Sequence, residues 1–151
     1  SGLSEPFGRP MVTLCDHGII PEQHEWTATR IRSTLVARSF YDTAGVEQWR
    51  EIVRKWVIHY GGSEANVSMF LSVMRQESGG NPCSTGPDIE YKGRIVNCLG
   101  LMQIHPCHAT AFQSITGRPY NPDVFDPEAN IQFAAYMSAG GTNWASWSVT
   151  P

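Results

Sequence analysis

Apolar residues recur at helical spacing in two consecutive stretches of this chain. The first spans residues 45–60 and ends at the Gly61-Gly62 pair, which predicts an amphipathic helix. The second is a stripe over residues 67–74 that leads to Glu77, with Ser63 before it as a candidate N-cap. The pattern therefore predicts two helices joined by a short glycine turn, with a carboxylic acid at the end of the second.

A less regular stretch and a third helix complete the pattern. Residues 79–99 have no helical period and predict a loop with a short hairpin near residues 90–96, and short helical pieces are expected over residues 101–113. Asp126-Pro127-Glu128 combines a capping acid, a proline at the first helical position and an acid in the first turn. This combination predicts a helix that continues through residues 129–139.

Length and composition indicate one domain. With 151 residues, 41% of them hydrophobic, the chain can bury a sizeable core. We expect residues 45–151 to form the catalytic core and residues 1–44, which carry little pattern, to form an N-terminal arm. The chain starts with Ser1-Gly2 and not with Met, as expected of a processed or excised piece.

Charge and hydropathy argue against two classes of partner. The formal net charge is −3, so the chain lacks the broad basic surface that binds nucleic acid. It also has no run of about eighteen apolar residues, so no membrane-spanning helix is expected.

The four cysteines favour two disulfides and hence an oxidising compartment. Three connectivities are possible, and the sequence alone does not choose among them. We expect a Cys83–Cys98 bridge because it would close the long segment between the Glu77 turn and Gly100. Cys15–Cys107 is then the second pair.

Three short motifs carry the chemistry of the chain. They are Glu77-Ser78 at the predicted helix end, Gly100-Leu101-Met102-Gln103-Ile104 after the loop, and Ala134-Ala135-Tyr136 in the third helix. Burial of a carboxyl at such a helix end raises its pKa and suits it to general acid catalysis. In this order the motifs resemble the lysozyme-like SLT family, which comprises soluble lytic transglycosylases and the related goose-type lysozymes. The resemblance covers about residues 64–147.

This resemblance implies a mainly α, lysozyme-like domain with a sugar-binding cleft, acting on the glycan strands of peptidoglycan. Glu77 matches the family's catalytic acid, which cleaves the bond between N-acetylmuramic acid and N-acetylglucosamine and leaves a 1,6-anhydro sugar. Ser78 matches its partner serine, and Tyr136 matches a tyrosine that holds the catalytic carboxyl by its hydroxyl. Each has a plainer interpretation, since Ser78 can simply begin the turn and Tyr136 can be a core residue.

The expected substrate-binding residues lie on the second motif and near the C-terminus. Gly100, Met102 and Gln103 match the cleft wall, although apolar residues of a short buried helix usually serve packing. Trp144 and Trp147 are suited either to stacking against sugar rings or to the core.

Two acids leave the reaction type open. The segment between Glu77 and Gly100 is long and contains Asp88 and Glu90. Inverting hydrolases need a second carboxylate roughly 6.5–9.5 Å from the acid, and goose-type lysozymes place acids in this segment. Asp88 or Glu90 could therefore make the site a hydrolase, or both could be solvated loop acids.

Two other classes of function compete with the enzyme. A binding module could keep the cleft without catalysis, although intact Glu77, Gln103 and Tyr136 argue against this. A thiol or metal enzyme could use the Cys107-His108 neighbours, but no zinc-type ligand spacing is present. The resemblance implies no metal or cofactor, and a place outside the cytoplasm: secreted, periplasmic or on a phage particle. A larger wall-penetrating or secretion assembly would fit the same family.

Overall fold

Two antiparallel helices form one side of the domain. The computed structural model describes Cys15 and residues 45–148, so the arm expected over residues 1–44 otherwise lies outside the described residues. The 3-10 turn η3 (Val46–Trp49) leads directly into α3 (Arg50–His59), and α4 (Glu64–Glu77) packs against α3. The side chain of Asn66 accepts hydrogen bonds from the Ser63 amide and hydroxyl, both 2.9 Å, so the predicted start of α4 is confirmed.

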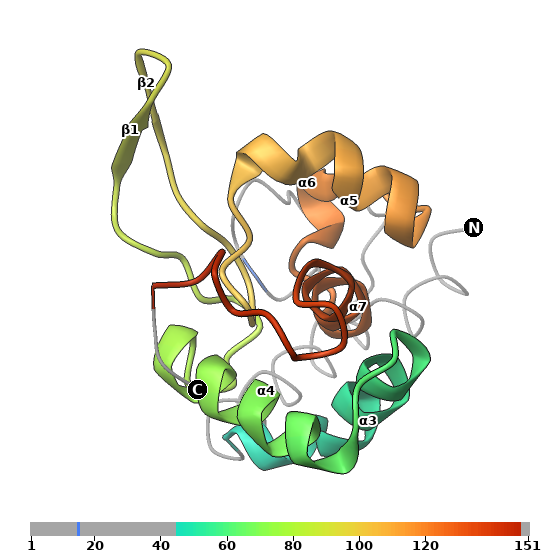
Figure 1. The fold of residues 1–151 in the computed structure, drawn as a ribbon. Coiled ribbons are helices and arrows are strands. Elements are labelled where there is room, and N and C mark those ends of the chain that lie inside the picture. The colour runs from blue at the N-terminus through green and yellow to red at the C-terminus, as the bar shows by residue number, and fades with distance from the viewer. Residues whose placement is uncertain (1–14, 16–44, 149–151) are drawn as a thin grey trace, which may run out of the picture.

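Helix α7 (Pro127–Met137) lies at the centre of the fold. Figure 1 shows it end-on, with α3 and α4 on one side and α5 (Ala109–Thr116) and α6 (Tyr120–Asp123) on the other. The helix begins where the Asp126-Pro127 pair predicted. Asp126 is its N-cap, and the Asp126 carboxylate accepts a hydrogen bond from the Ala129 amide at 3.0 Å. Seven of its eleven residues are buried, as expected of a helix at the centre of the core.

The loop between α4 and α5 carries the only sheet among the described residues. Strands β1 (Ile89–Tyr91) and β2 (Arg94–Val96) pair antiparallel through a two-residue turn at Lys92-Gly93, which confirms the predicted hairpin. Figure 1 shows the hairpin projecting from the helical body. The 3-10 turn η4 (Pro106–His108) then leads into α5.

The core forms where α7 meets the helices around it. Its largest fully buried side chains include Phe70 and Met74 of α4, Phe112 of α5, and Ile131 and Phe133 of α7. No helix in the described part of the chain is both long and apolar enough to cross a bilayer. Apart from one two-stranded sheet, the regular elements of the described residues are helices, which confirms the mainly α-helical class expected from the sequence.

Candidate active site at the end of helix α4

Glu77 is the last residue of α4, and its side chain is half-buried. Its carboxylate has no hydrogen bond or ion pair within the residues that the structure describes. Burial raises the pKa of the Glu77 carboxyl, and no charged side chain among the described residues contributes to that rise. A carboxyl of this kind keeps its proton to a higher pH than a solvated glutamate, as a general acid requires.

The turn after Glu77 is held against the start of η3. Gly80 has a φ of +90°, and a Cβ there would lie 2.5 Å from the carbonyl carbon and oxygen of Gly45. The buried Trp49 indole donates to the Gly80 carbonyl at 2.9 Å. Because both contacts reach across to residues that precede α3, the end of α4 is fixed from outside the helix.

Ser78 takes part in the same turn. Its hydroxyl donates to the Met74 carbonyl at 3.3 Å and accepts from the Gly80 amide at 3.1 Å. These bonds hold the helix end in place, which agrees with the plainer interpretation that Ser78 begins the turn.

The second motif is folded tightly against α7. Gly100 has a φ of +83°, and a Cβ there would lie 2.3 Å from the side-chain nitrogen of Asn130. The Asn130 side chain accepts from the Met102 amide at 2.8 Å and donates to the carbonyls of Val124 at 2.8 Å and Leu99 at 3.2 Å. This fully buried asparagine therefore sets the position of residues 99–102.

Cys98 lies within electrostatic range of Glu77, which the positions of the two residues along the chain did not indicate. The pKa of the Cys98 thiol is raised first by burial and then by the negative charges of Glu77 and Cys107. Cys98 immediately precedes Leu99, whose amide and carbonyl pair with Ile104. The loop that carries the second motif thus approaches the end of α4 closely enough for the charge of Glu77 to act on Cys98.

A comparison with protein families identifies the domain that contains these residues. Residues 59–140 match the model of the Transglycosylase SLT domain, which is more than half of the chain. The chain belongs to this family. The match begins at the end of α3 and ends after α7, so it contains Glu77, the second motif and Asn130. No curated protein and no solved structure matches the chain.

Membership of the SLT family carries two general implications. The SLT domain implies transglycosylase-type cleavage of glycosidic bonds, with peptidoglycan as the substrate. Proteins with this domain act on peptidoglycan outside the cytoplasm, and the disulfide described below is consistent with that setting.

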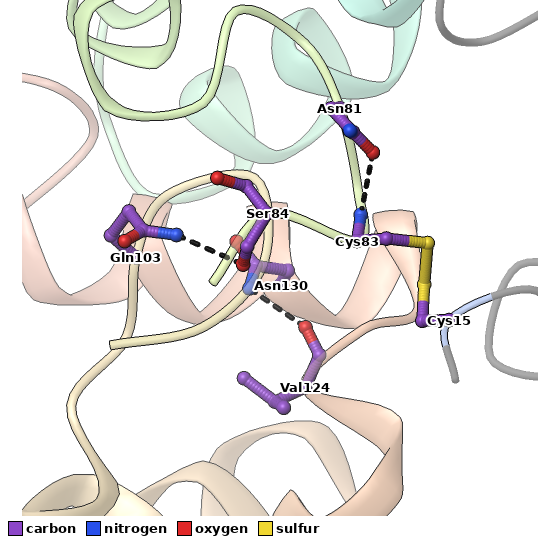
Figure 2. Close-up of a disulfide and its surroundings, with 7 residues drawn as sticks. All are labelled: Cys15, Asn81, Cys83, Ser84, Gln103, Val124 and Asn130. Atoms are coloured by element: carbon purple, nitrogen blue, oxygen red, sulfur yellow. Dashed lines mark hydrogen bonds between the residues drawn. A yellow bond between two sulfur atoms is a disulfide. The ribbon is translucent and has the colours of Figure 1, made fainter. Parts of the chain in front are cut away.

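Within this SLT domain, Gln103 connects two loops. Its side-chain amide donates to the backbone carbonyls of Ser84 at 3.1 Å and Gly100 at 3.0 Å, and Figure 2 shows the first of these bonds. Both amide hydrogens are therefore used within the protein, and the side-chain oxygen lies close to Gly86, where a Cβ would be 2.5 Å from it.

Met102 is fully buried, so its side chain serves packing. Its backbone amide is bound by Asn130 and its carbonyl accepts from the Trp147 indole at 2.8 Å. Trp147 is itself buried and thus ties the end of the described chain to the second motif. Trp144 is half-buried, with its indole on the Gly141 carbonyl and its ring edge-on to Phe70 and Trp147.

The structure does not bring Tyr136 to Glu77. Its ring is 44% exposed and lies 5.9 Å from the ring of Tyr60 and 6.1 Å from that of Phe133, measured between centroids. Its hydroxyl has no hydrogen bond among the described residues. Tyr136 lies near the C-terminal end of α7 and contacts the end of α3, whereas Glu77 is at the far end of α4 from that contact.

Asp88 and Glu90 belong to the hairpin and share no hydrogen bond with Glu77. The Asp88 carboxylate accepts from the Asn97 side chain at 2.8 Å, and Glu90 is exposed on β1, paired with Ile95. In the described part of the chain, no three His, Cys, Asp or Glu side chains gather closely enough to hold a metal ion.

The predicted disulfide pairing is wrong. Cys83 is bonded to Cys15, from which it is separated by 68 positions in sequence, and Cys98 and Cys107 are free thiols. Figure 2 shows the Cys83 side chain pointing away from Ser84 and Gln103, toward the segment that carries Cys15. The prediction assumed that a bridge would close the long segment between Glu77 and Gly100, but the direction of the Cys83 side chain decides its partner. The Cys83–Cys98 bridge was expected to connect the two ends of this segment. Hydrogen bonds from the Gln103 side chain to Ser84 and from the Asn130 side chain to Leu99 hold these ends instead.

Proposed function

We propose that this protein is a lytic transglycosylase that cleaves the β-1,4 bond between N-acetylmuramic acid and N-acetylglucosamine, with Glu77 as its single acid and base. The observation that carries the proposal is the environment of Glu77. Burial alone raises the pKa of this carboxyl, and it has no hydrogen-bonding or ion-pairing partner among the described residues. A proton held in this way is available for transfer.

The reaction needs one carboxyl that changes its protonation state twice. Protonated Glu77 donates its proton to the glycosidic oxygen, and the bond from that oxygen to muramyl C1 breaks. The resulting Glu77 carboxylate then accepts the proton of the muramyl 6-hydroxyl as its oxygen bonds to C1. The product is a 1,6-anhydro sugar, Glu77 regains its proton, and no water is consumed.

The alternative is a muramidase in which a second carboxylate activates water. We favour the transglycosylase because Asp88 and Glu90 lie on the projecting hairpin and neither contributes to the pKa of Glu77. The two reactions give products that differ in mass by one water.

Mass spectrometry of the products released from purified peptidoglycan tests the proposal. We expect 1,6-anhydro-muramyl products from the wild type and a loss of about 10²–10⁴-fold in rate for Glu77→Gln, which keeps the shape but not the transferable proton. Glu64→Gln, in the exposed first turn of the same helix, is the matched control and should retain activity. A folded Glu77→Gln protein with full activity would refute the assignment.

The same products decide between the two reactions. Reducing-end products from the wild type would establish the muramidase, and Asp88→Asn or Glu90→Gln should then abolish turnover. Binding to peptidoglycan without any released product would instead establish a non-catalytic module. The remaining site residues of the proposal are supporting ones: Gly100, Met102 and Gln103 hold the loop beside Glu77, and Ser78 holds the turn.

The proposed site of action is outside the cytoplasm, as a secreted, periplasmic or phage-particle protein. The Cys15–Cys83 disulfide supports an oxidising compartment. A role in a larger assembly has no support in the described residues or in the family match.

A further inference from the structure

A small pocket lies between the hairpin and η4, outside the residues used above. We call it the hairpin pocket. It has a volume of about 200 Å³ and is lined by Tyr91, Lys92, Arg94, Val96, Pro106 and Cys107. Sites for whole drug-sized ligands measure about 300–1,000 Å³, so the hairpin pocket suits one small group of a larger ligand.

The strand register separates two faces of the hairpin. Tyr91 pairs with Arg94, and because cross-strand partners share a face, both project to the side that carries the pocket. Glu90 pairs with Ile95 on the opposite face. The pocket therefore has two cationic side chains, Lys92 and Arg94, and no acid among its lining residues.

These two cations lack the partners that most other cations in the described chain have. Arg50, Arg54, Lys55 and Arg118 each form an ion pair with a carboxylate. Lys92 and Arg94 form none with any described residue, although Lys92 lies 5.3 Å above the Tyr91 ring. Lys92 and Arg94 therefore place two positive charges without ion pairs beside one apolar pocket, in a chain whose net charge is −3.

The walls of the pocket define the rest of the ligand. The Tyr91 ring is fixed edge-on to the His105 ring, with centroids 4.8 Å apart, and Val96 and Pro106 supply aliphatic surface. A matching group is short, aliphatic and ends in a carboxylate. In peptide-bearing peptidoglycan the lactyl carboxyl of each muramyl residue is used in the amide bond to the peptide, so the free carboxylates of the polymer lie on that short peptide.

We propose that the hairpin pocket binds the carboxylate-bearing end of the peptide attached to the muramyl residue. This inference rests on the proposed function for the identity of the polymer. The pocket is next to the second motif along the chain, because Pro106 and Cys107 line the pocket and Ile104, which pairs with Leu99, is only two residues before Pro106.

Binding to the inactive Glu77→Gln protein tests the proposal without turnover. Backbone amide NMR shifts of the hairpin are followed during titration with three probes: the disaccharide carrying a tetrapeptide, the same compound with an amidated C-terminus, and the peptide-free disaccharide with its lactyl carboxyl capped as an amide. We expect the free acid to shift the amides of Tyr91, Gly93 and Arg94, and amidation to weaken its binding about tenfold. The peptide-free disaccharide should leave these signals in place.

Variants identify the groups that bind. Lys92→Gln and Arg94→Gln should each weaken binding of the free acid about three- to fivefold, as expected for partly exposed ion pairs. Arg50→Gln removes the same charge on α3 and should leave the affinity unchanged. Equal binding of the free acid and the amide, equal shifts from the peptide-free disaccharide, or full affinity in Arg94→Gln would each overturn the proposal.

The experiments distinguish failure of the proposed catalytic function from failure of the peptide subsite. If the wild-type protein released no anhydro-muramyl product while the hairpin still selected the free acid, the catalytic assignment alone would be wrong. If product were released but the hairpin showed no such selection, the peptide subsite alone would be wrong.

Discussion

Asn130 of α7 holds the backbone of Met102, with its side-chain oxygen 2.8 Å from the Met102 amide. The same side chain donates to the carbonyls of Val124 and Leu99, and Asn130 is fully buried. One residue of the central helix thereby positions the loop that lies beside Glu77.

Asn130→Ala should destabilise the protein by about 3 kcal/mol, because the buried Met102 amide and Val124 carbonyl lose their partner, whereas the Leu99 carbonyl keeps its bond from the Ile104 amide. Urea unfolding monitored by tryptophan fluorescence measures this. Asn97→Ala is the matched control: its amide binds the Gly86 carbonyl and Asp88 at the base of the hairpin, where water can replace it, and should cost below about 1 kcal/mol. Equal losses in the two variants would contradict the role given to Asn130.

Glu77→Gln should raise the stability of the protein at neutral pH. Burial raises the pKa of folded Glu77 above its unfolded value, so the folded state binds more protons between these two values and stability falls as pH rises through them. Below the ordinary glutamate pKa of about 4.3, both states are protonated and the advantage of the variant should vanish.

Urea unfolding of the wild type and Glu77→Gln at pH 7 and at about pH 3.5 checks this sign. Glu64→Gln serves as the control. It should lower the stability at pH 7 where Glu77→Gln raises it, because it only loses the ion pair with Arg54. A Glu77→Gln protein that is less stable than the wild type at pH 7 would show that the carboxylate has favourable contacts.

Glu77→Gln should also make Cys98 more reactive. The charge of Glu77 contributes to the raised pKa of the Cys98 thiol, so its removal should increase the thiolate fraction and speed alkylation by iodoacetamide about two- to fivefold at pH 8. Peptide mass spectrometry over time measures the rate, with the exposed Cys107 as the reference thiol in the same protein. An unchanged rate at Cys98 would mean that Glu77 and Cys98 are not neighbours.

Loss of the Cys15–Cys83 disulfide should destabilise the protein by about 4 kcal/mol in the chain-entropy model, since it closes a long loop. Its two cysteines are 68 residues apart in sequence. Cys15→Ser with Cys83→Ser tests this by urea unfolding, and Cys98→Ser with Cys107→Ser is the control that keeps the bridge. Non-reducing peptide mapping should recover Cys15 linked to Cys83, and a Cys83–Cys98 peptide would contradict the structure.

The sequence by itself determined the features that depend on neighbouring residues. Ser63 and the Gly79-Gly80 pair define where α4 begins and ends, and Asp126-Pro127 defines the start of α7. The hairpin at residues 89–96 was also predictable from its turn and strand residues. Caps, turns and helical periodicity act over a few residues, so the local sequence contains their cause.

Only the tertiary structure decided which distant residues meet. Cys83 bonds to Cys15, Tyr136 packs on Tyr60, and Cys98 lies near Glu77. The family motifs placed Glu77 beside the second motif, but no local signal marked Asn130 as the residue that holds that loop. Such contacts depend on how helices pack and on the direction in which each side chain leaves its backbone, and neither is set by the spacing of residues along the chain.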